Sequence, residues 1–209
     1  MRDPDRDTLL RLAARQAGHF TLAQAAECGF TGAQIRAHQK TGTFARVHPS
    51  VYRFVRYPAP SYGKVMAAWL AARGDGVVVS HETALWLHGL SARSGREVHL
   101  TLGTQSDRGQ QTPLRSVILH VARRRWRPDE VVRWEGMAVT APARTIVDAA
   151  EGGAGSQAIE RAVHAALGSG LATRKTLADA ARGRSKKVGA LLGRAVRTAP
   201  PASARSLEA

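Results

Sequence analysis

The stretch that decides the fold runs from residue 9 to residue 54: LLRLAARQAG (9–18), HFTLAQAAECG (19–29), FTGAQIRAHQKTG (30–42) and TFARVHPSVYRF (43–54). Apolar residues recur at helical spacing in the first three segments, and each of these segments ends in glycine. In the fourth segment, Pro49 and Ser50 separate two short β-type runs, which favours a hairpin. This order predicts a winged helix-turn-helix, a fold that places one helix in the DNA major groove.

Capping residues predict where the three helices begin. The expected N-caps are Asp7 or Thr8 for the first helix, Thr21 for the second (22–27) and Thr31 for the third (32–40). Gln24 and Gln34 each stand three residues after a capping threonine, which is the spacing of a capping box. The third helix therefore has a well-defined start.

The third helix is amphipathic in a way that suits DNA reading. Ile35 faces the core, with Thr31, His38 and Gln39 near its side of the helix. The opposite face carries Ala33, Arg36, Ala37 and Lys40, with Gln34 at one flank. Arginine and glutamine can bond base edges through their forked groups, and cations beside the wing can meet phosphates. The predicted DNA-binding residues are Thr31, Gln34, Arg36 and Lys40 on the helix, and Arg46, His48, Arg53 and Arg56 on or beside the hairpin.

The charge of the chain supports a polyanionic partner. Its 209 residues carry a formal net charge of +15, with 31 Lys and Arg against 16 Asp and Glu, and 26 of the cations are Arg. GC-rich coding explains the choice of Arg over Lys, but it does not explain the twofold excess of basic residues. The alternative to double-stranded DNA as the partner is a solvated charged face on a helical domain.

The second half of the chain predicts a mixed α/β domain. Expected helices cover 62–73, 81–88, 142–150, 157–167, 173–181 and 187–196, and expected strands cover 77–79, 97–102, 117–122, 131–134 and 137–139. We expect a flexible loop at 103–116. The fold class is α+β: a winged helix-turn-helix domain (1–57), an α/β domain with C-terminal helices (58–198) and a disordered tail (199–209). Its core is expected to use Leu, Val, Ala and the four Trp.

Other chemistries have little support in the sequence. His81 and His88 are two helical turns apart, His99 and His120 lie on strands, and no metal-ligand spacing joins them, so we expect no metal site. Walker, GxSxG, GxGxxG and magnesium-nuclease patterns are lacking, so we predict no catalytic residues, no cofactor and no enzyme activity. The basic run RRRWR (123–127) fits either a nucleic-acid contact or a solvated strand end.

Compartment signals are few. Cys28 is the single cysteine, on the apolar side of a short helix, and we interpret it as a small buried hydrophobe. No apolar run is long enough to span a bilayer, and the N-terminus lacks a secretory pattern. We therefore expect a cytoplasmic protein with no membrane partner.

Several motifs together resemble the AbiEi-type antitoxins of type IV toxin–antitoxin (abortive infection) systems. They are the winged helix ending in GTFARVHPSVYRF (42–54), SHETALWLHGL (80–90), VHLTL (98–102) and VTAPARTIVDAA (139–150). The last is the most specific, with Pro142 at the first position of a helix. Some relatives add a C-terminal endonuclease-like domain; this chain departs from them, because its residues after 150 are helical and lack the nuclease cluster.

The resemblance implies a transcriptional autorepressor whose N-terminal domain binds inverted repeats at its own promoter. The alternative is a protein-interaction antitoxin that neutralises a nucleotidyltransferase-like toxin, with DNA binding secondary. Among the shared residues, we expect Ser80 to be an N-cap and Trp86 and Leu87 to fill the core. Arg144 lies in the first turn of its helix, where the dipole disfavours a cation, so we expect it to pair with Asp148 at i+4.

Overall fold

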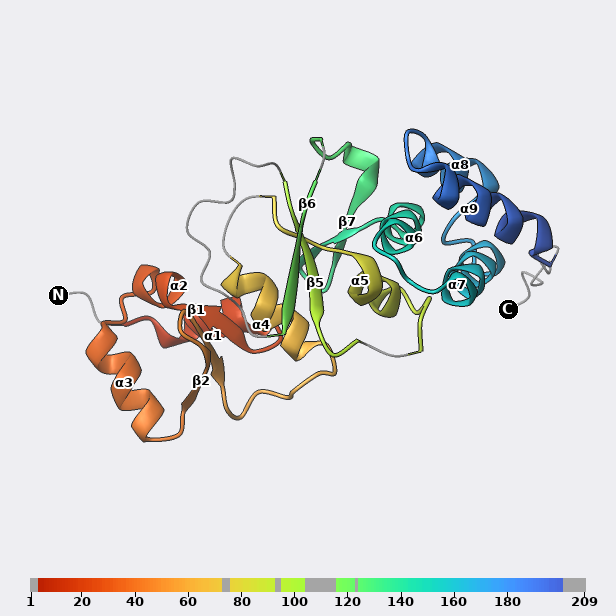
Figure 1. Cartoon of the computed structure of the whole chain (residues 1–209). Helices are drawn as coiled ribbons and strands as arrows, with labels where there is room; N and C mark the ends of the chain where they lie inside the picture. The colour runs from red at the N-terminus through yellow and green to blue at the C-terminus, as the bar shows by residue number, and fades with distance from the viewer. Residues whose placement is uncertain (1–3, 73–75, 93–94, 104–115, 123, 201–209) are drawn as a thin grey trace.

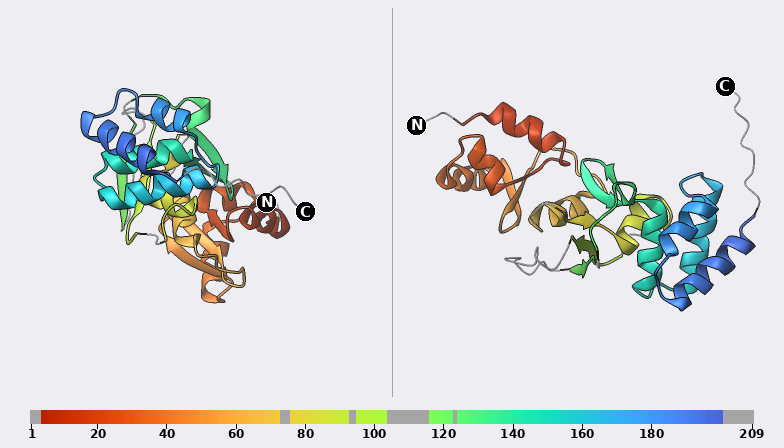
Figure 2. Two further views of the ribbon diagram at one scale, coloured as in Figure 1. Left: turned by 90° about the vertical axis from the view of Figure 1, so that its right-hand side faces the viewer. Right: turned by 90° about the horizontal axis from the view of Figure 1, so that it is seen from above.

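A computed structural model describes residues 4–72, 76–92, 95–103, 116–122 and 124–200. The molecule is elongated, with a small N-terminal unit at one end, a five-stranded sheet in the middle and a group of helices at the other end (Figure 1). The view from above shows the same separation of the two ends (Figure 2, right). The expected α+β class is confirmed. Most of the loop expected at 103–116 and all but two residues of the expected tail lie outside the described residues.

The N-terminal unit is a winged helix-turn-helix. Its elements are α1 (Arg6–Ala14), β1 (His19–Thr21), α2 (Leu22–Glu27), α3 (Gly32–Lys40), β2 (Phe44–His48) and β3 (Val51–Phe54). The hairpin β2–β3 is the expected wing. The sequence missed β1, a three-residue strand that pairs antiparallel with β3 and completes a sheet of order β1-β3-β2. A strand this short has no alternation of its own to detect, because the hairpin beside it creates the pairing.

The helix starts are set by local hydrogen bonds. Thr21 and Thr31 accept from the backbone N–H of Gln24 and Gln34, whose side chains accept in return from the threonine N–H groups, so both predicted capping boxes are confirmed. The expected cap of the first helix was wrong. Asp5 caps α1, because its carboxylate accepts from both the backbone N–H and the hydroxyl of Thr8, at 2.8 and 2.6 Å.

Aromatic rings hold the winged helix together. Phe20 on β1 lies edge-on to Phe44 at 5.0 Å between ring centroids, and Phe44 meets Phe54 at 4.9 Å. Leu9 and Ile35 close this core from α1 and α3 and are almost fully buried. The face of α3 that carries Ile35 is therefore fixed against the sheet, and the opposite face points outward.

The second unit is built on a five-stranded mixed sheet of order β6-β5-β4-β8-β7. Its strands are β4 (Val78–Val79), β5 (Val98–Leu102), β6 (Val117–Val121), β7 (Val131–Trp134) and β8 (Met137–Thr140). β5 and β6 run parallel, as do β4 and β8, whereas β4–β5 and β7–β8 are antiparallel. The predicted partnership of 97–102 with 117–122 and the hairpin at Glu135 and Gly136 are confirmed.

Helices surround this sheet and extend beyond it. They are α4 (Gly63–Ala71), α5 (His81–Leu87), a 3-10 turn η2 (Pro128–Glu130), α6 (Pro142–Glu151), α7 (Ser156–Gly168), α8 (Arg174–Ala181) and α9 (Lys186–Thr198). One core joins α4 and the sheet, and a second joins α5 to α6–α9. The four tryptophans, expected inside, are only partly buried; Leu87 is buried as expected, and Trp86 packs at the edge of the first core.

Candidate nucleic-acid interface

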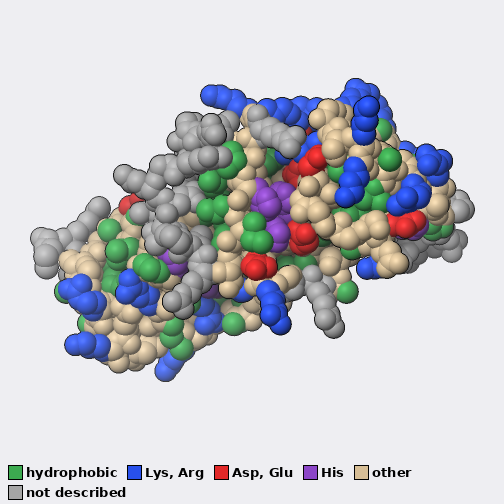
Figure 3. Space-filling view, viewed as in Figure 1, with side chains coloured by type: hydrophobic (Ala, Val, Ile, Leu, Met, Phe, Trp, Pro, Cys, Tyr) green, Lys and Arg blue, Asp and Glu red, His purple; other side chains and the backbone are tan. Residues whose placement is uncertain are grey.

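Helix α3 presents the surface that the sequence predicts. Ile35 is 1% exposed, whereas Arg36 and Lys40 are exposed, as are the small residues Ala33 and Ala37 beside them. In Figures 1 and 2 this helix lies at the end of the molecule away from α7–α9, so the second unit does not cover it. The space-filling view shows separate Lys and Arg side chains projecting from this end (Figure 3). A cationic helix with small residues between its cations can approach base edges closely.

Thr31 and Gln34 are hydrogen-bonded to each other at the start of α3. The side-chain oxygen of Gln34 accepts from the Thr31 N–H at 2.8 Å and from the Thr31 hydroxyl at 2.9 Å. The amide oxygen is therefore committed, and Gln34 can offer only its NH₂ group to a base. Bidentate bonding of adenine by an amide needs both groups, and in this structure the oxygen of Gln34 serves the cap of α3.

Removing the cap should loosen α3. We expect Thr31→Ala to lower the free energy of unfolding by about 1 kcal/mol, because the Gln34 N–H loses its acceptor. Urea unfolding followed by circular dichroism measures the change. Ser156→Ala removes an exposed hydroxyl from the first turn of α7 and serves as the control. Equal stability of the two variants would contradict the assigned role of Thr31.

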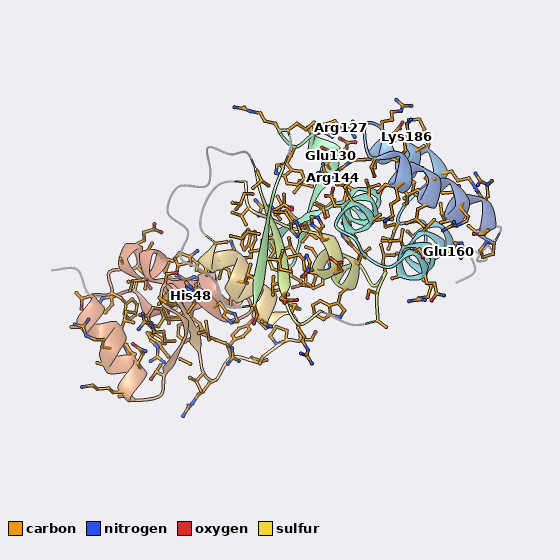
Figure 4. All side chains as sticks on the ribbon, in the orientation of Figure 1. His48, Arg127, Glu130, Arg144, Glu160 and Lys186 are labelled. Carbon is orange, nitrogen blue, oxygen red and sulfur yellow. The ribbon has the colours of Figure 1, made fainter. Side chains whose placement is uncertain are left out.

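The wing carries two outward cations and one neutral imidazole. Arg46 and Arg56 are exposed, and Arg46 donates to the Pro49 carbonyl at 3.2 Å. His48 lies beside the bend, labelled in Figure 4, with Nδ1 accepting from the Ser50 N–H at 3.3 Å. Burial and the nearby Arg46 charge lower the pKa of His48, so at neutral pH it is an uncharged donor through Nε2.

Arg53 differs from the other predicted wing residues. It is half-buried on β3, and its guanidinium donates to the backbone carbonyl of Tyr57 at the base of the wing. The hydroxyl of Tyr57 in turn donates to the Ala14 carbonyl at 3.0 Å, which ties the end of the wing to α1. Arg53 therefore supports the base of the wing instead of projecting into solvent as Arg46 and Arg56 do.

A buried ion network lies in the second unit, where η2 meets α6. The predicted pair is confirmed: Arg144 Nε donates to Asp148 Oδ2 at 2.7 Å, and both side chains are almost fully buried. Figure 4 labels Arg127, Glu130 and Arg144 side by side at this point. Glu130 accepts from Arg144 at 3.1 Å and from Arg124 at 2.5 and 2.8 Å. Arg184 bonds the other Asp148 oxygen at 2.7 Å.

The network shifts the pKa of its central carboxylate. Burial alone would raise the pKa of Glu130, but hydrogen bonds from Arg124 and from the Arg127 N–H, with the Arg144 charge nearby, lower it to about 2. Trp126 lies under Arg144, with its ring centroid 4.8 Å from the guanidinium carbon. The described part of RRRWR is thus partly engaged within the second unit, and Arg123 lies outside the described residues.

Comparison with protein-family models now identifies the chain. Residues 7–55 match the model described as a transcriptional regulator, AbiEi antitoxin, and residues 76–194 match the AbiEi antitoxin C-terminal domain. The protein belongs to the AbiEi antitoxin family. The resemblance drawn from the sequence motifs is confirmed, and the N-terminal unit of this AbiEi protein is a transcriptional-regulator domain.

A solved structure has the same fold as this AbiEi protein. It is the crystal structure of the RV2827C protein from Mycobacterium tuberculosis, with a TM-score of 0.58 and 15% sequence identity, covering 90% of this chain and 75% of that one. At this identity the likeness concerns the fold alone. A comparison with curated proteins gives no match. Within the described ranges, no helix of the AbiEi protein combines the length and apolar character that crossing a bilayer requires.

The sequence spacing did not predict that three histidines of this AbiEi protein lie together. His81 at the start of α5, His99 on β5 and His120 on β6 come together, with one ring nitrogen of each within 4.8 Å of the others. We name them the three-histidine cluster. Sequence separations of 18 and 21 residues carry no motif, because the cluster arises from strand pairing. A signal was nevertheless present: histidines stand on two runs that were predicted to be neighbouring strands.

Proposed function

We propose that this AbiEi protein is a sequence-specific DNA-binding repressor of its own operon. Helix α3 enters the major groove at promoter repeats, and the wing contacts phosphates. The single observation that supports this proposal most is the outward face of α3, where Arg36 and Lys40 are exposed while Ile35 is buried on the inner side of the same helix. The transcriptional-regulator model that matches residues 7–55 supports the same role.

Helix and wing take different parts in this proposal. Base edges in the major groove carry sequence information, so Arg36 and Lys40 provide specificity, whereas phosphate contacts provide affinity for any duplex. Arg46 and Arg56 are exposed on and just after the wing, where the adjacent backbone would lie. His48 adds a neutral donor between them.

A binding assay on the DNA upstream of the operon tests the proposal. Fluorescence anisotropy with the full chain should give tight binding to the upstream fragment and weak binding to a shuffled fragment of equal length. Affinity should fall steeply as salt rises, since each neutralised phosphate releases counterions. Equal affinity for both fragments at all salt concentrations would overturn sequence-specific reading.

The wing makes a separate prediction about salt dependence. Arg46→Ala and Arg56→Ala should each weaken binding to both fragments alike and reduce the slope of log affinity against log salt by about 0.9. Arg161→Ala on α7 is the control, because Arg161 is exposed at the opposite end of the molecule. A wing variant that changes the ratio between the two fragments, with an unchanged slope, would assign the wing to base reading.

A second function concerns the C-terminal half, which matches an antitoxin domain. We propose that residues 58–198 neutralise a nucleotidyltransferase-like toxin by contact. Residues 156–198 carry nine Lys and Arg against two Asp and Glu, and eight of these cations are exposed, which suits an acidic partner surface.

Co-expression with the product of the neighbouring reading frame tests this second function. The two proteins should co-purify, and the growth arrest that the neighbouring product causes should be relieved. Relief without a stable complex would exclude neutralisation by contact.

A further inference from the structure

The three-histidine cluster is built by the sheet, and its members come from three elements. His99 and His120 lie on the same face of the parallel pair β5–β6, where Thr101 is the register partner of His120. His81 follows β4 directly, and the Ser80 N–H donates to the His99 carbonyl at 3.1 Å. The ring of His81 stacks on that of His120 with 3.6 Å between centroids and 12° between planes. His99 Nδ1 lies 3.0 Å from His120 Nε2.

The three imidazoles offer nitrogen donors of the kind that zinc binds. Burial, reinforced by His120, His99 and Arg144, lowers the pKa of His81 to about 3. Burial and His99 also lower the pKa of His120, partly opposed by the carboxylates Glu82 and Asp148. Imidazole nitrogen is a common ligand of zinc and similar ions, and one nitrogen of each ring lies within 4.8 Å of the others.

A carboxylate oxygen of Glu82 lies beside the cluster, next to the ring of His99. Glu82 Oε2 is buried, makes no hydrogen bond within the described residues, and lies 3.3 Å from His99 Nδ1. The Glu82 side chain is 36% exposed overall, so this carboxylate reaches both the solvent and the ring of His99. It stands where it can ligate an ion directly or orient the ring of His99.

The surroundings hold the rings and leave one side open. Ser80 Oγ lies 2.9 Å from His81 Nδ1 and accepts from the Thr101 hydroxyl at 2.7 Å, which fixes the orientation of the first ring. His81 has a positive φ of 52°, a strained conformation for a side chain of this size. Gly152 allows this ring to lie close, because a Cβ there would be 2.9 Å from His81 Cδ2.

The open side is a cleft of about 520 Å³. His81 and His120 line it, together with Arg144, Asp148 and Arg184 of the buried ion network. In Figure 3 the histidine side chains reach the surface in the middle of the molecule, next to acidic side chains. Arg144 and Arg184 are both paired with Asp148, and Arg124 and Arg182 also line the cleft, so its walls carry four arginines against the carboxylates of Asp148 and Glu151.

We propose that His81, His99 and His120 bind one divalent transition-metal ion of the zinc class, with an open coordination position toward this cleft. Zinc–nitrogen bonds of about 2.0–2.1 Å in a tetrahedral site place ligand nitrogens roughly 3.3 Å apart. The nitrogens of His99 and His120 are near this spacing, and the three together span 4.8 Å. Binding replaces the His99–His120 hydrogen bond and turns the rings until their lone pairs converge. The open position takes water or an anionic ligand that faces Arg144.

Metal titration of the full chain, without an affinity tag, tests this site. After treatment with a chelator, calorimetry with Zn²⁺ and Co²⁺ at pH 7.5 should give one ion per chain, removable by EDTA. Because losing even an outer contact to a metal site costs 10–100-fold in affinity, losing a ligand should cost more than about 100-fold. His99→Gln and His120→Gln should each show this loss. The matched control is His164→Gln, whose ring bonds the Ala195 carbonyl on α9 at 3.0 Å and lies outside the cluster.

Two further measurements separate the loss of a metal ligand from the loss of the fold. Circular dichroism of each metal-free variant checks that it is folded. X-ray absorption of the zinc-loaded wild-type protein, which needs no variant, should count three imidazole ligands. The absence of saturable binding by the wild-type protein, unchanged affinity in a folded His120→Gln variant, or fewer than three imidazoles at the zinc ion would each overturn the site.

Discussion

Replacing Arg36 and Lys40 together with alanine is expected to abolish specific binding to the upstream DNA. Both side chains are exposed on the outward face of α3, and the core contact of Ile35 on the opposite face is untouched. A good side-chain contact to a base edge contributes about 1–3 kcal/mol of discrimination. Loss of two such contacts should weaken binding to the upstream fragment by roughly 100-fold or more. Affinity for the shuffled fragment should fall much less.

A charge-matched variant separates base reading from general electrostatics. Arg161→Ala with Lys187→Ala removes the same charge from exposed positions on α7 and α9. This control should keep its preference for the upstream fragment, with at most a small loss of affinity at low salt. If the α3 variant keeps the preference while the control loses it, α3 is not the reading helix, and the basic helices at the other end of the molecule take its place.

Replacing Glu130 with glutamine is expected to destabilise the second unit by about 3 kcal/mol at pH 7. Glutamine keeps the size of the side chain but removes the negative charge that faces Arg124 and Arg144 in the buried ion network. Breaking a buried ion pair by removing one partner costs 3–5 kcal/mol, because the remaining charge is left uncompensated. The pKa of Glu130, lowered from 4.5 to about 2, corresponds to a similar energy. Urea unfolding of the full chain measures it.

The pH dependence of this difference provides a signature. Because the pKa of Glu130 is depressed in the folded protein, its stabilisation is fully present above the unfolded value of 4.5. It is lost progressively as the pH falls from there toward 2. The difference between wild type and Glu130→Gln should therefore shrink by roughly half between pH 7 and pH 3. Glu97→Gln, at an exposed position, should match the wild type throughout. A difference that stays constant with pH would mean that packing, not charge, is lost.

What could be predicted from the sequence is what depends on near neighbours along the chain. The boxes at Thr21 and Thr31 join residues three apart, and the Arg144–Asp148 pair joins residues four apart, so helix geometry brings each pair together in any fold. The outward face of α3 follows in the same way, since burial of Ile35 fixes where Arg36 and Lys40 point. A candidate reading helix can thus be found before any coordinates exist.

Contacts between residues far apart in the sequence could be found only from the three-dimensional structure. Asp148 meets Arg184 across 36 residues, the Tyr57 hydroxyl bonds the Ala14 carbonyl across 43 residues, and the short strand β1 exists because β3 lies beside it. The three-histidine cluster depends on the register of β5 with β6 and on the turn that places His81 after β4. No local propensity encodes these contacts, because each is stabilised only after the chain has folded back and burial has fixed the partners.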